Sequence, residues 1–446
     1  MSVLAIVGFG MITIFMILLM TKRITAMNGL ILIPIAVALA LGFGPKVGAM
    51  ALDGIKKVAP TAVMIAFAMV YFMIMIDTGL FDPLINAILK AAKGDPIRVI
   101  VGTALLAGLV SLDGDGATTY IVTTSAMLAV HRRIGIDPII LPTMAIMQNG
   151  VMNITPWGGP TGRVMAALQL DASQVFPQLI PGMIVATCWV LVYAYFLGRK
   201  ERARLGVLSA DKYEASPISA AYAVELEDGS GAAELKRPKL FWFNLLLTIT
   251  LLGLLGADII PLNVLFMTAS ALALVVNYGG DVKLQAARIS HYGGNVWSNI
   301  SMVLSAGIFT GIMQQTKMID AMAGTLVNNI PPAAGPYLAL VTAFTSLPFD
   351  YFLTNDAYYF GIVPVLAKTA ATYGITAAEI ARASLVAQGC HLLSPLVAST
   401  YLLIGLNGVT LGELTKKALL PSIVSSIVID RCGAGHRGVP HRTLNH

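Results

Sequence analysis

A succession of apolar stretches runs through almost the whole chain, and this feature limits more than any other what the chain can fold into. Of the 446 residues, 57% are hydrophobic and only 12% are charged, where an ordinary soluble protein carries about 25% charged residues. So little charge cannot cover the surface of a soluble globule. We therefore interpret the chain as a polytopic integral membrane protein, with the lipid bilayer as its surroundings.

Several of these stretches are interrupted by Gly, Pro or Asp, or are shorter than the roughly 20 apolar residues that a spanning helix needs. Residues 97–112, 117–130 and 335–347 are examples. Short and interrupted stretches at membrane depth indicate re-entrant hairpins and broken helices. The sequence predicts an all-α integral membrane protein, and its length leaves room for about 11–12 transmembrane helices.

One long polar segment, residues 198–239, divides the chain and carries Arg and Lys at both ends. Basic loops of membrane proteins lie in the cytoplasm, so we place this segment there. The net charge of +6 then reflects cytoplasmic loops and predicts no nucleic-acid partner. The predicted organisation is a first transmembrane repeat (1–198), a cytoplasmic linker (199–239), a second transmembrane repeat (240–429) and an atypical polar tail (430–446).

The two halves share motifs at a nearly constant separation. Residues 149–161 and 388–400 have the same skeleton of amide, Gly, hydroxyl, Pro and Thr, 239 positions apart. An internal duplication explains this agreement. Charge then suggests opposite orientations, because the first apolar stretch ends at Lys22 and Arg23 whereas the helix near Leu240 begins at a basic segment. Further landmarks at separations of 238 to 241 are Thr78 with Thr316, Asp115 with Asp356, and Pro181 with Pro421.

Two acidic segments interrupt apolar surroundings at corresponding places, residues 111–119 and 346–357. Each is predicted to form the tip of a re-entrant hairpin. Charged groups are costly inside a bilayer, so Asp113, Asp115 and Asp356 are candidates for a functional site. The alternative is that Asp113 and Asp115 merely cap a helix.

The two Pro-centred motifs are predicted to break one spanning helix in each half. A break at residues 158–160 frees backbone groups around Gly159 and exposes a helix N-terminus near Thr161, which favours a carboxylate. Arg163, the nearest cation, is a candidate partner for a carboxylate, the alternative being an interfacial charge. His391 is either a proton carrier or a structural histidine. Neutral hydrogen-bonding candidates for a small polar solute are Asn149, Asn153, Thr155, Thr161, Gln388, Ser394 and Thr400.

These segments resemble a known family. Residues 353–357 look like the Asn-Asp hairpin motif of the ion transporter superfamily, and residues 21–23, 111–120 and 149–163 resemble the metal–citrate:proton symporters (CitMHS). The resemblance extends to about Ile429. It implies uptake of citrate complexed with Mg²⁺ or Ca²⁺, coupled to protons, across the bacterial inner membrane, with no permanently bound cofactor and a homodimeric assembly.

Carried over to this sequence, the resemblance places Asp113, Asp115 and Asp356 at the metal or on the proton path. The motifs are acidic and almost free of Lys and Arg, which agrees with this resemblance. Carboxylates are good ligands of hard cations and would face the metal of the complex. His391 joins the proton-coupling candidates. The substrate-binding candidates are Asn149, Asn153, Thr155, Gly159, Thr161, Arg163, Asn355, Gln388, Ser394 and Thr400.

Other functions share some of these features. Within transport, the alternatives are a carrier of a free di- or tricarboxylate or a gluconate-like anion, and a Na⁺/H⁺-type antiporter. An intramembrane aspartyl protease is disfavoured because Asp115, which lacks a Gly two positions before it, and Asp350, which follows Phe349, lack the sequence contexts of its catalytic pair. A passive channel is disfavoured because nothing in the sequence suggests a continuous polar stripe or a ring of repeated subunits. We therefore expect a carrier and not an enzyme.

The end of the chain departs from the duplicated pattern. After Pro421 the apolar residues stop at Asp430, whereas in the first half they continue further past Pro181. A last helix over 417–429 would be too short to span comfortably. The sequence therefore predicts an altered polar tail.

Overall fold

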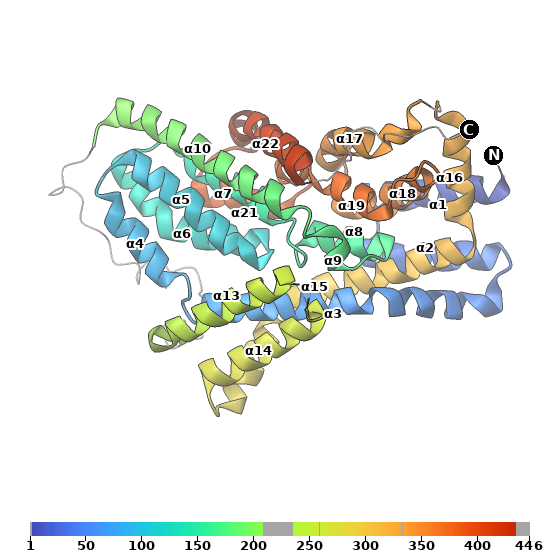
Figure 1. The fold of residues 1–446 in the computed structure, drawn as a ribbon, viewed down its shortest axis with the longest axis horizontal. Coiled ribbons are helices and arrows are strands. Elements are labelled where there is room, and N and C mark those ends of the chain that lie inside the picture. Colours follow the sequence, from blue (N-terminus) through green and yellow to red (C-terminus); the bar gives the residue numbers. More distant parts are fainter. Residues whose placement is uncertain (1, 208–234, 258, 332, 434–446) are drawn as a thin grey trace.

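The computed structural model describes residues 2–207, 235–257, 259–331 and 333–433. Throughout these ranges the regular structure is helical, which confirms the predicted all-α class (Figure 1). Most of the predicted linker and of the polar tail lies outside the described residues. The described start of the linker is helical, because the preceding helix continues to Leu205.

The first half contains three long or medium helices, a short connecting helix, a hairpin, a broken helix and a closing helix. In order these are α1 (Val3–Met20), α2 (Ala26–Ala40), η1 (Gly44–Lys46) with α3 (Val47–Asp77), α4 (Asp82–Ala92), the hairpin α5 (Pro96–Val110), η2 (Ser111–Asp113) and α6 (Gly116–Ile134), the broken helix α7 (Ile140–Met152) and α8 (Gly159–Leu168), α9 (Ala172–Val175), and α10 (Ile180–Leu205).

The second half repeats this order. It consists of η4 (Pro238–Leu240) with α13 (Phe241–Ala257), α14 (Leu262–Tyr278), α15 (Val282–Gln315), α16 (Met318–Asn329), η5 (Gly335–Tyr337) with the hairpin α17 (Leu338–Phe352), the π-helical segment η6 (Ala357–Ile362) and α18 (Val363–Ala371), the broken helix α19 (Ala377–Leu385), α20 (Gln388–His391) and α21 (Ala398–Asn407), and α22 (Leu411–Gly433).

The long helices α3 of the first half and α15 of the second half pack against each other, antiparallel and in close contact. Glycines make the contact close: a Cβ on Gly54 would lie 1.9 Å from the carbonyl oxygen of Gly307, and one on Gly311 would lie 2.8 Å from the Cα of Gly54. Small residues let helix backbones approach in this way when no hydrophobic effect drives the helices together. The α3–α15 pair is therefore a tightly packed scaffold along one side of the molecule.

The two hairpins lie towards opposite ends of the long axis, with their tips near the middle (Figure 1). Helix α6 of the first hairpin packs against α21, the second half of the other repeat's broken helix. Reciprocally, η6 and α18 of the second hairpin pack against α8. Each hairpin therefore meets the broken helix of the other half, as expected of two repeats in inverted orientation.

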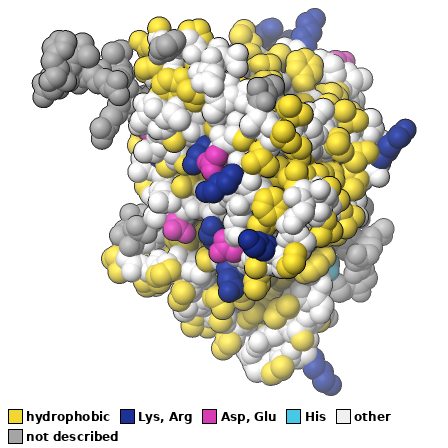
Figure 2. All heavy atoms as spheres, turned by 90° about the vertical axis from the view of Figure 1, so that its right-hand side faces the viewer, with side chains coloured by type: hydrophobic (Ala, Val, Ile, Leu, Met, Phe, Trp, Pro, Cys, Tyr) yellow, Lys and Arg dark blue, Asp and Glu magenta, His cyan; other side chains and the backbone are white. Residues whose placement is uncertain are grey.

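Apolar side chains cover much of the outside. Six helical segments of the described chain are long and apolar enough to cross a membrane, among them α1, α10 and α15. Exposed residues include Trp242, Leu246 and Ile259, at 75%, 65% and 72% exposure. On the face shown in Figure 2, hydrophobic side chains spread widely, while charged ones gather in a central group and otherwise protrude singly at the edges. Such a surface fits a multi-pass membrane protein.

The expected short last helix is wrong. Helix α22 runs over Leu411–Gly433, 23 residues, and does not begin at 417. The sequence contains a start signal for it that the expectation overlooked: the backbone N–H and hydroxyl of Thr410 donate to Glu413 at 2.8 and 2.7 Å, and Glu413 N–H donates back to the Thr410 hydroxyl at 3.3 Å. This capping box satisfies the free N–H groups of the first turn and starts the helix six residues earlier.

Candidate functional site

The tip of the first hairpin is organised by its two aspartates. Gly114 turns the chain with φ of +76°, a conformation that other residues rarely adopt. Asp115 then caps α6, accepting from the backbone N–H of Ala117 and Thr118 at 3.4 and 3.0 Å and from the Thr118 hydroxyl at 2.7 Å. Asp113 accepts from the Asp115 N–H at 2.9 Å and is buried. Asp115 therefore has the helix-capping role that sequence analysis considered as an alternative. Its carboxylate remains at the tip of the hairpin.

The same tip is fastened to the first broken helix by Trp157. The indole N–H of Trp157 donates to the carbonyl of Leu112 at 2.7 Å, and a Cβ on Gly114 would lie 2.9 Å from the indole ring. Trp157 also stacks on Phe72 of α3, with ring centroids 5.3 Å apart. The break between α7 and α8 therefore holds the hairpin tip and the scaffold together. Sequence analysis treated Trp157 only as part of a family motif.

The broken helices of the two halves touch at corresponding glycines. A Cβ on Gly150 would lie 2.6 Å from the Cα of Gly389, its counterpart 239 positions later. Nearby, a Cβ on Gly116 would approach Asn149 at 2.9 Å and Ser399 at 3.2 Å. Residues of the first hairpin and of both broken helices therefore converge at one place, as the sequence predicted.

Two buried amides beside this contact make equivalent hydrogen bonds. Asn149 donates from Nδ2 to the Tyr120 hydroxyl at 3.0 Å, and Gln388 donates from Nε2 to the Tyr359 hydroxyl at 2.8 Å. The two amide donors are 239 positions apart in the sequence, and so are the two tyrosine acceptors. The sequence analysis missed both tyrosines, although the constant separation could have found them. They hold the two amides in matching positions on the two halves.

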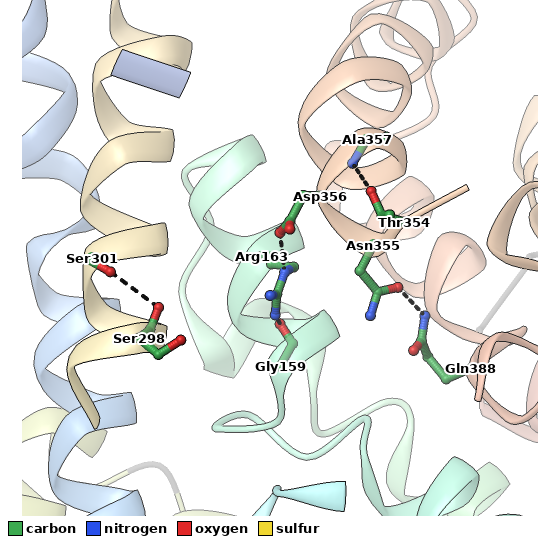
Figure 3. Close-up of polar contacts among 9 residues, drawn as sticks. All are labelled: Gly159, Arg163, Ser298, Ser301, Thr354, Asn355, Asp356, Ala357 and Gln388. Carbon is green, nitrogen blue, oxygen red and sulfur yellow. Dashed lines mark hydrogen bonds and ion pairs between the residues drawn. The ribbon is translucent and has the colours of Figure 1, made fainter. Parts of the chain in front are cut away.

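The second tip is built on a threonine cap. The Ala357 N–H donates to the Thr354 hydroxyl at 3.2 Å, and the Asn355 side chain accepts from Gln388 at 3.4 Å (Figure 3). Thr354 lies 239 positions after Asp115 and has its capping role. The landmark that paired Asp115 with Asp356 is therefore two residues out of register.

Asp356 instead faces Arg163 of the other half. Nε of Arg163 donates to Oδ1 of Asp356 at 2.7 Å, and its Nη1 donates to the Gly159 carbonyl at 3.0 Å (Figure 3). The side chains keep 19% and 16% exposure respectively. The candidate carboxylate partner of Arg163 is thus supplied by the other half of the protein itself.

The remaining candidates lie around the two breaks, all buried. Within the described part of the chain, the hydroxyls of Thr155 and Thr161 have no hydrogen-bond partner. Their counterparts differ: the Thr400 hydroxyl donates to the Leu392 carbonyl at 2.5 Å, and the Ser394 hydroxyl accepts from the Leu396 N–H at 3.2 Å. The first half therefore offers unpaired hydroxyls where the second half uses its hydroxyls structurally. Asn153 lies in the same region, at the end of α7.

His391 and Asp350 connect the second break to the second hairpin. Nδ1 of His391 lies 2.6 Å from the Asp350 carbonyl, and because a carbonyl only accepts, this nitrogen carries the proton. The Asp350 carboxylate accepts from Gln388 at 3.1 Å. Asp350 is fully buried and was not among the predicted residues. Asp350 lies within the acidic segment 346–357, and that segment is the sequence signal from which it could have been predicted.

The structure does not gather the three predicted metal ligands into one group. Among the residues described, no cluster of three or more His, Cys, Asp or Glu is placed to hold a metal ion. Asp113 and Asp115 share the first tip, whereas Asp356 is engaged by Arg163 at the second. The arrangement consists of two separate acidic sites and not a preformed metal cage.

A cavity of about 210 Å³ lies between α6, α3 and α15 and reaches the first tip at Thr118. Its polar wall on α15 includes His291, Tyr292 and Asn295. Asp77, at the end of α3, binds Arg288 at 2.6 Å and accepts from the Tyr292 hydroxyl. Further along α15, Ser298 and Ser301 lie on the stretch that packs near α8 (Figure 3). Sequence analysis did not select the polar residues of α15 as site candidates.

Comparison with known proteins identifies the relatives of this chain. The family model described as citrate transporter, CitMHS, matches residues 12–387. A "Citrate transporter" of Bacillus subtilis (strain 168) is 52% identical over 426 residues, covering 96% of this chain and 97% of that protein. The "Mg(2+)/citrate complex secondary transporter" of the same organism is 48% identical over 427 residues, covering 96% of each. The crystal structure of the Alcanivorax borkumensis YdaH transporter matches with a TM-score of 0.58 and 14% identity over 86% of both chains, which is a likeness of fold.

Proposed function

The chain belongs to the CitMHS citrate transporter family, and we propose that it is a secondary active transporter that carries citrate complexed with a divalent metal ion across the bacterial inner membrane together with protons. The observation that carries the proposal is the convergence of the two halves. Each half brings an irregular hairpin tip and a broken helix towards the contact between Gly150 and Gly389. Irregular backbone and polar groups in an apolar protein are typical of a solute site.

Citrate binding is proposed for the neutral and basic groups at this convergence. The unpaired hydroxyls of Thr155 and Thr161 offer donors to carboxylate oxygens, and α8 presents its N-terminal N–H groups from Gly159 onward. Arg163 supplies a fork that fits a carboxylate. The other proposed substrate-binding residues are Asn149, Asn153, Asn355, Gln388, Ser394 and Thr400.

The metal is proposed to travel as part of the substrate. Mg²⁺ and Ca²⁺ prefer oxygen ligands, and Mg²⁺ in particular keeps several waters and binds one or two carboxylates. Asp113, Asp115 and Asp356 are therefore proposed as the carboxylates of which one or two at a time would contact the metal. A relative that is 48% identical is named for the Mg²⁺–citrate complex, which supports this assignment.

Proton coupling is proposed for the acidic tips and His391. A carboxylate that releases the metal can take up a proton instead, which keeps the local charge balanced. His391 is bonded through Nδ1 and has Nε2 available for proton exchange. The exposed apolar helices also leave surface for a homodimer, which we propose as the assembly in the membrane.

Citrate uptake into proteoliposomes with an imposed pH gradient tests the proposal. Expected is uptake that excess EDTA abolishes and that Mg²⁺ or Ca²⁺ restores. Uptake that persists in EDTA would favour the carrier of free di- or tricarboxylates. Uptake driven by a Na⁺ gradient and indifferent to pH would remove the protons from the proposal.

A further inference from the structure

Arg163 and Asp356 form an ion pair between the two repeats at the proposed site. Arg163 extends from the first turns of α8, and Asp356 lies at the second hairpin tip. Nε and Oδ1 are 2.7 Å apart. Since both side chains remain partly exposed, at 19% and 16%, a carboxylate of a small solute can reach the same guanidinium.

The duplication does not explain this pair. The position 239 residues after Arg163 is Leu402, and the position 239 residues before Asp356 is Ala117. Capping, glycine and amide–tyrosine features all recur at that separation, whereas the ion pair occurs on one side only. The pair therefore gives a nearly symmetric site one cationic end, against which an asymmetric substrate can be oriented.

We propose that Asp356 is an internal substitute for a substrate carboxylate and determines the preference for metal-complexed over free citrate. The inference rests on the proposed function and deepens it. A citrate carboxylate displaces Asp356 from Arg163. The released Asp356 then supplies an oxygen to the metal of the same complex.

Charge balance is the reason for the preference. Exchange of one carboxylate for another keeps Arg163 paired, but it leaves Asp356 without a cation in a mostly buried position beside an anion. A metal complex brings a divalent cation with it, which gives Asp356 a counter-ion and leaves the entering substrate with less negative charge than free citrate. Free citrate brings only further negative charge. The ion pair therefore weakens the binding of free citrate relative to that of the metal complex.

Equilibrium binding of radiolabelled citrate to the purified full chain in detergent tests the proposal. Binding is measured with saturating Mg²⁺ and with excess EDTA, and the ratio of the two dissociation constants gives the preference. In Asp356→Asn, Arg163 has no competing carboxylate and the metal loses a ligand. Expected is a preference that falls about tenfold or more, equivalent to a free-energy change of 1.4 kcal/mol or more.

Asp320→Asn is the matched control. It also removes an aspartate from an ion pair, with Lys368 at 2.8 Å, in the first turn of α16 and away from the site. Its preference is expected to equal that of the wild type. A folded Asp356→Asn with an unchanged preference, or a control that changes equally, would overturn the inference.

Arg163→Gln/Asp356→Asn covers the case in which the single variant does not fold, because it leaves neither partner unpaired. Expected is weakened binding of both forms and a preference close to one, whereas the wild-type preference in this variant would overturn the inference. Failure of the proposed function looks different. The wild type itself would then bind citrate equally with Mg²⁺ and with EDTA, or not at all.

Discussion

The two repeats share a backbone plan but differ in the groups they place on it. Both have a capped hairpin tip, a buried amide on a tyrosine and a glycine at the contact between broken helices. The first tip uses Asp115 as its cap and adds Asp113, whereas the second uses the neutral Thr354 and pairs Asp356 with Arg163. Duplication thus explains the shape of the site, and later divergence explains its chemistry.

Alanine substitutions at the two contact glycines should give the largest difference between the two repeats. A Cβ on Gly150 would meet the Gly389 backbone at 2.6 Å, whereas one on Gly389 would meet only Ser422, at 3.5 Å. Gly150→Ala should therefore force the two broken helices apart and cost about 3 kcal/mol or more with loss of uptake, while Gly389→Ala is tolerated. Thermal unfolding in detergent and citrate uptake measure both. Equal effects of the two changes would contradict the close contact.

The two caps should differ in strength. Asp115 accepts three hydrogen bonds at the start of α6, and Thr354 accepts one at the second tip. Asp115→Ala should destabilise by about 2 kcal/mol and Thr354→Ala by about 1 kcal/mol or less. Asp115→Asn, which keeps a good cap but removes the charge, should retain stability and lose metal-dependent uptake. Full uptake by this variant would leave Asp115 with a structural role alone.

The amide–tyrosine pairs should respond unequally to loss of the hydroxyl. Tyr120→Phe removes the one partner recorded in the described chain for the buried Asn149 donor, at a cost of about 2 kcal/mol. In Tyr359→Phe, Gln388 keeps Asp350 and Asn355 as acceptors, and the Ser384 carbonyl loses the hydroxyl that donates to it at 3.2 Å, so about 1 kcal/mol is expected. Unfolding midpoints of the two variants, compared in one detergent, check the order. The reverse order would mean that the second pair is the stronger constraint.

The peripheral ion pairs should show the smallest effect. Asp82 pairs with Lys236 at 2.9 Å, and Asp320 pairs with Lys368 at 2.8 Å, in the first turns of α4 and α16. The hydrogen bond from Lys368 lowers the pKa of Asp320 below its ordinary 3.8. The resulting stability is present above that ordinary pKa and is lost as the pH falls through the lowered pKa of the folded protein.

Because both pairs are partly exposed, Asp320→Asn and Asp82→Asn should each cost less than about 0.5 kcal/mol at pH 7. The Asp320 variant should also lose part of the stability difference between pH 7 and pH 3. Unfolding midpoints across that range measure the effect. A cost above 2 kcal/mol for either change would show that these pairs hold the connecting helices in place.

Much of the plan could be predicted from the sequence because it depends on local patterns. Apolar stretches interrupted by Gly, Pro and Asp predicted the helices, both hairpin tips and both breaks, and the duplicated motif predicted that the halves correspond. Thr155, Thr161, Asn149 and Gln388 were predicted because they recur in the two Pro-centred motifs and offer neutral hydrogen-bond partners beside the breaks. The start of α22 was also predictable, because the capping box of Thr410 and Glu413 is a local signal in the sequence.

The sequence by itself determined a multi-pass helical membrane protein of the citrate transporter family, since composition, periodicity and long motifs are properties of the chain alone. Only the tertiary structure decided which groups meet: Tyr120 with Asn149, Trp157 with the first tip, and Arg163 with Asp356. The reason is that these partners are 29, 45 and 193 positions apart, and at such separations the sequence does not determine which residues come close in space. Packing of the two inverted repeats brings these partners together, including the ion pair whose two members come from different halves.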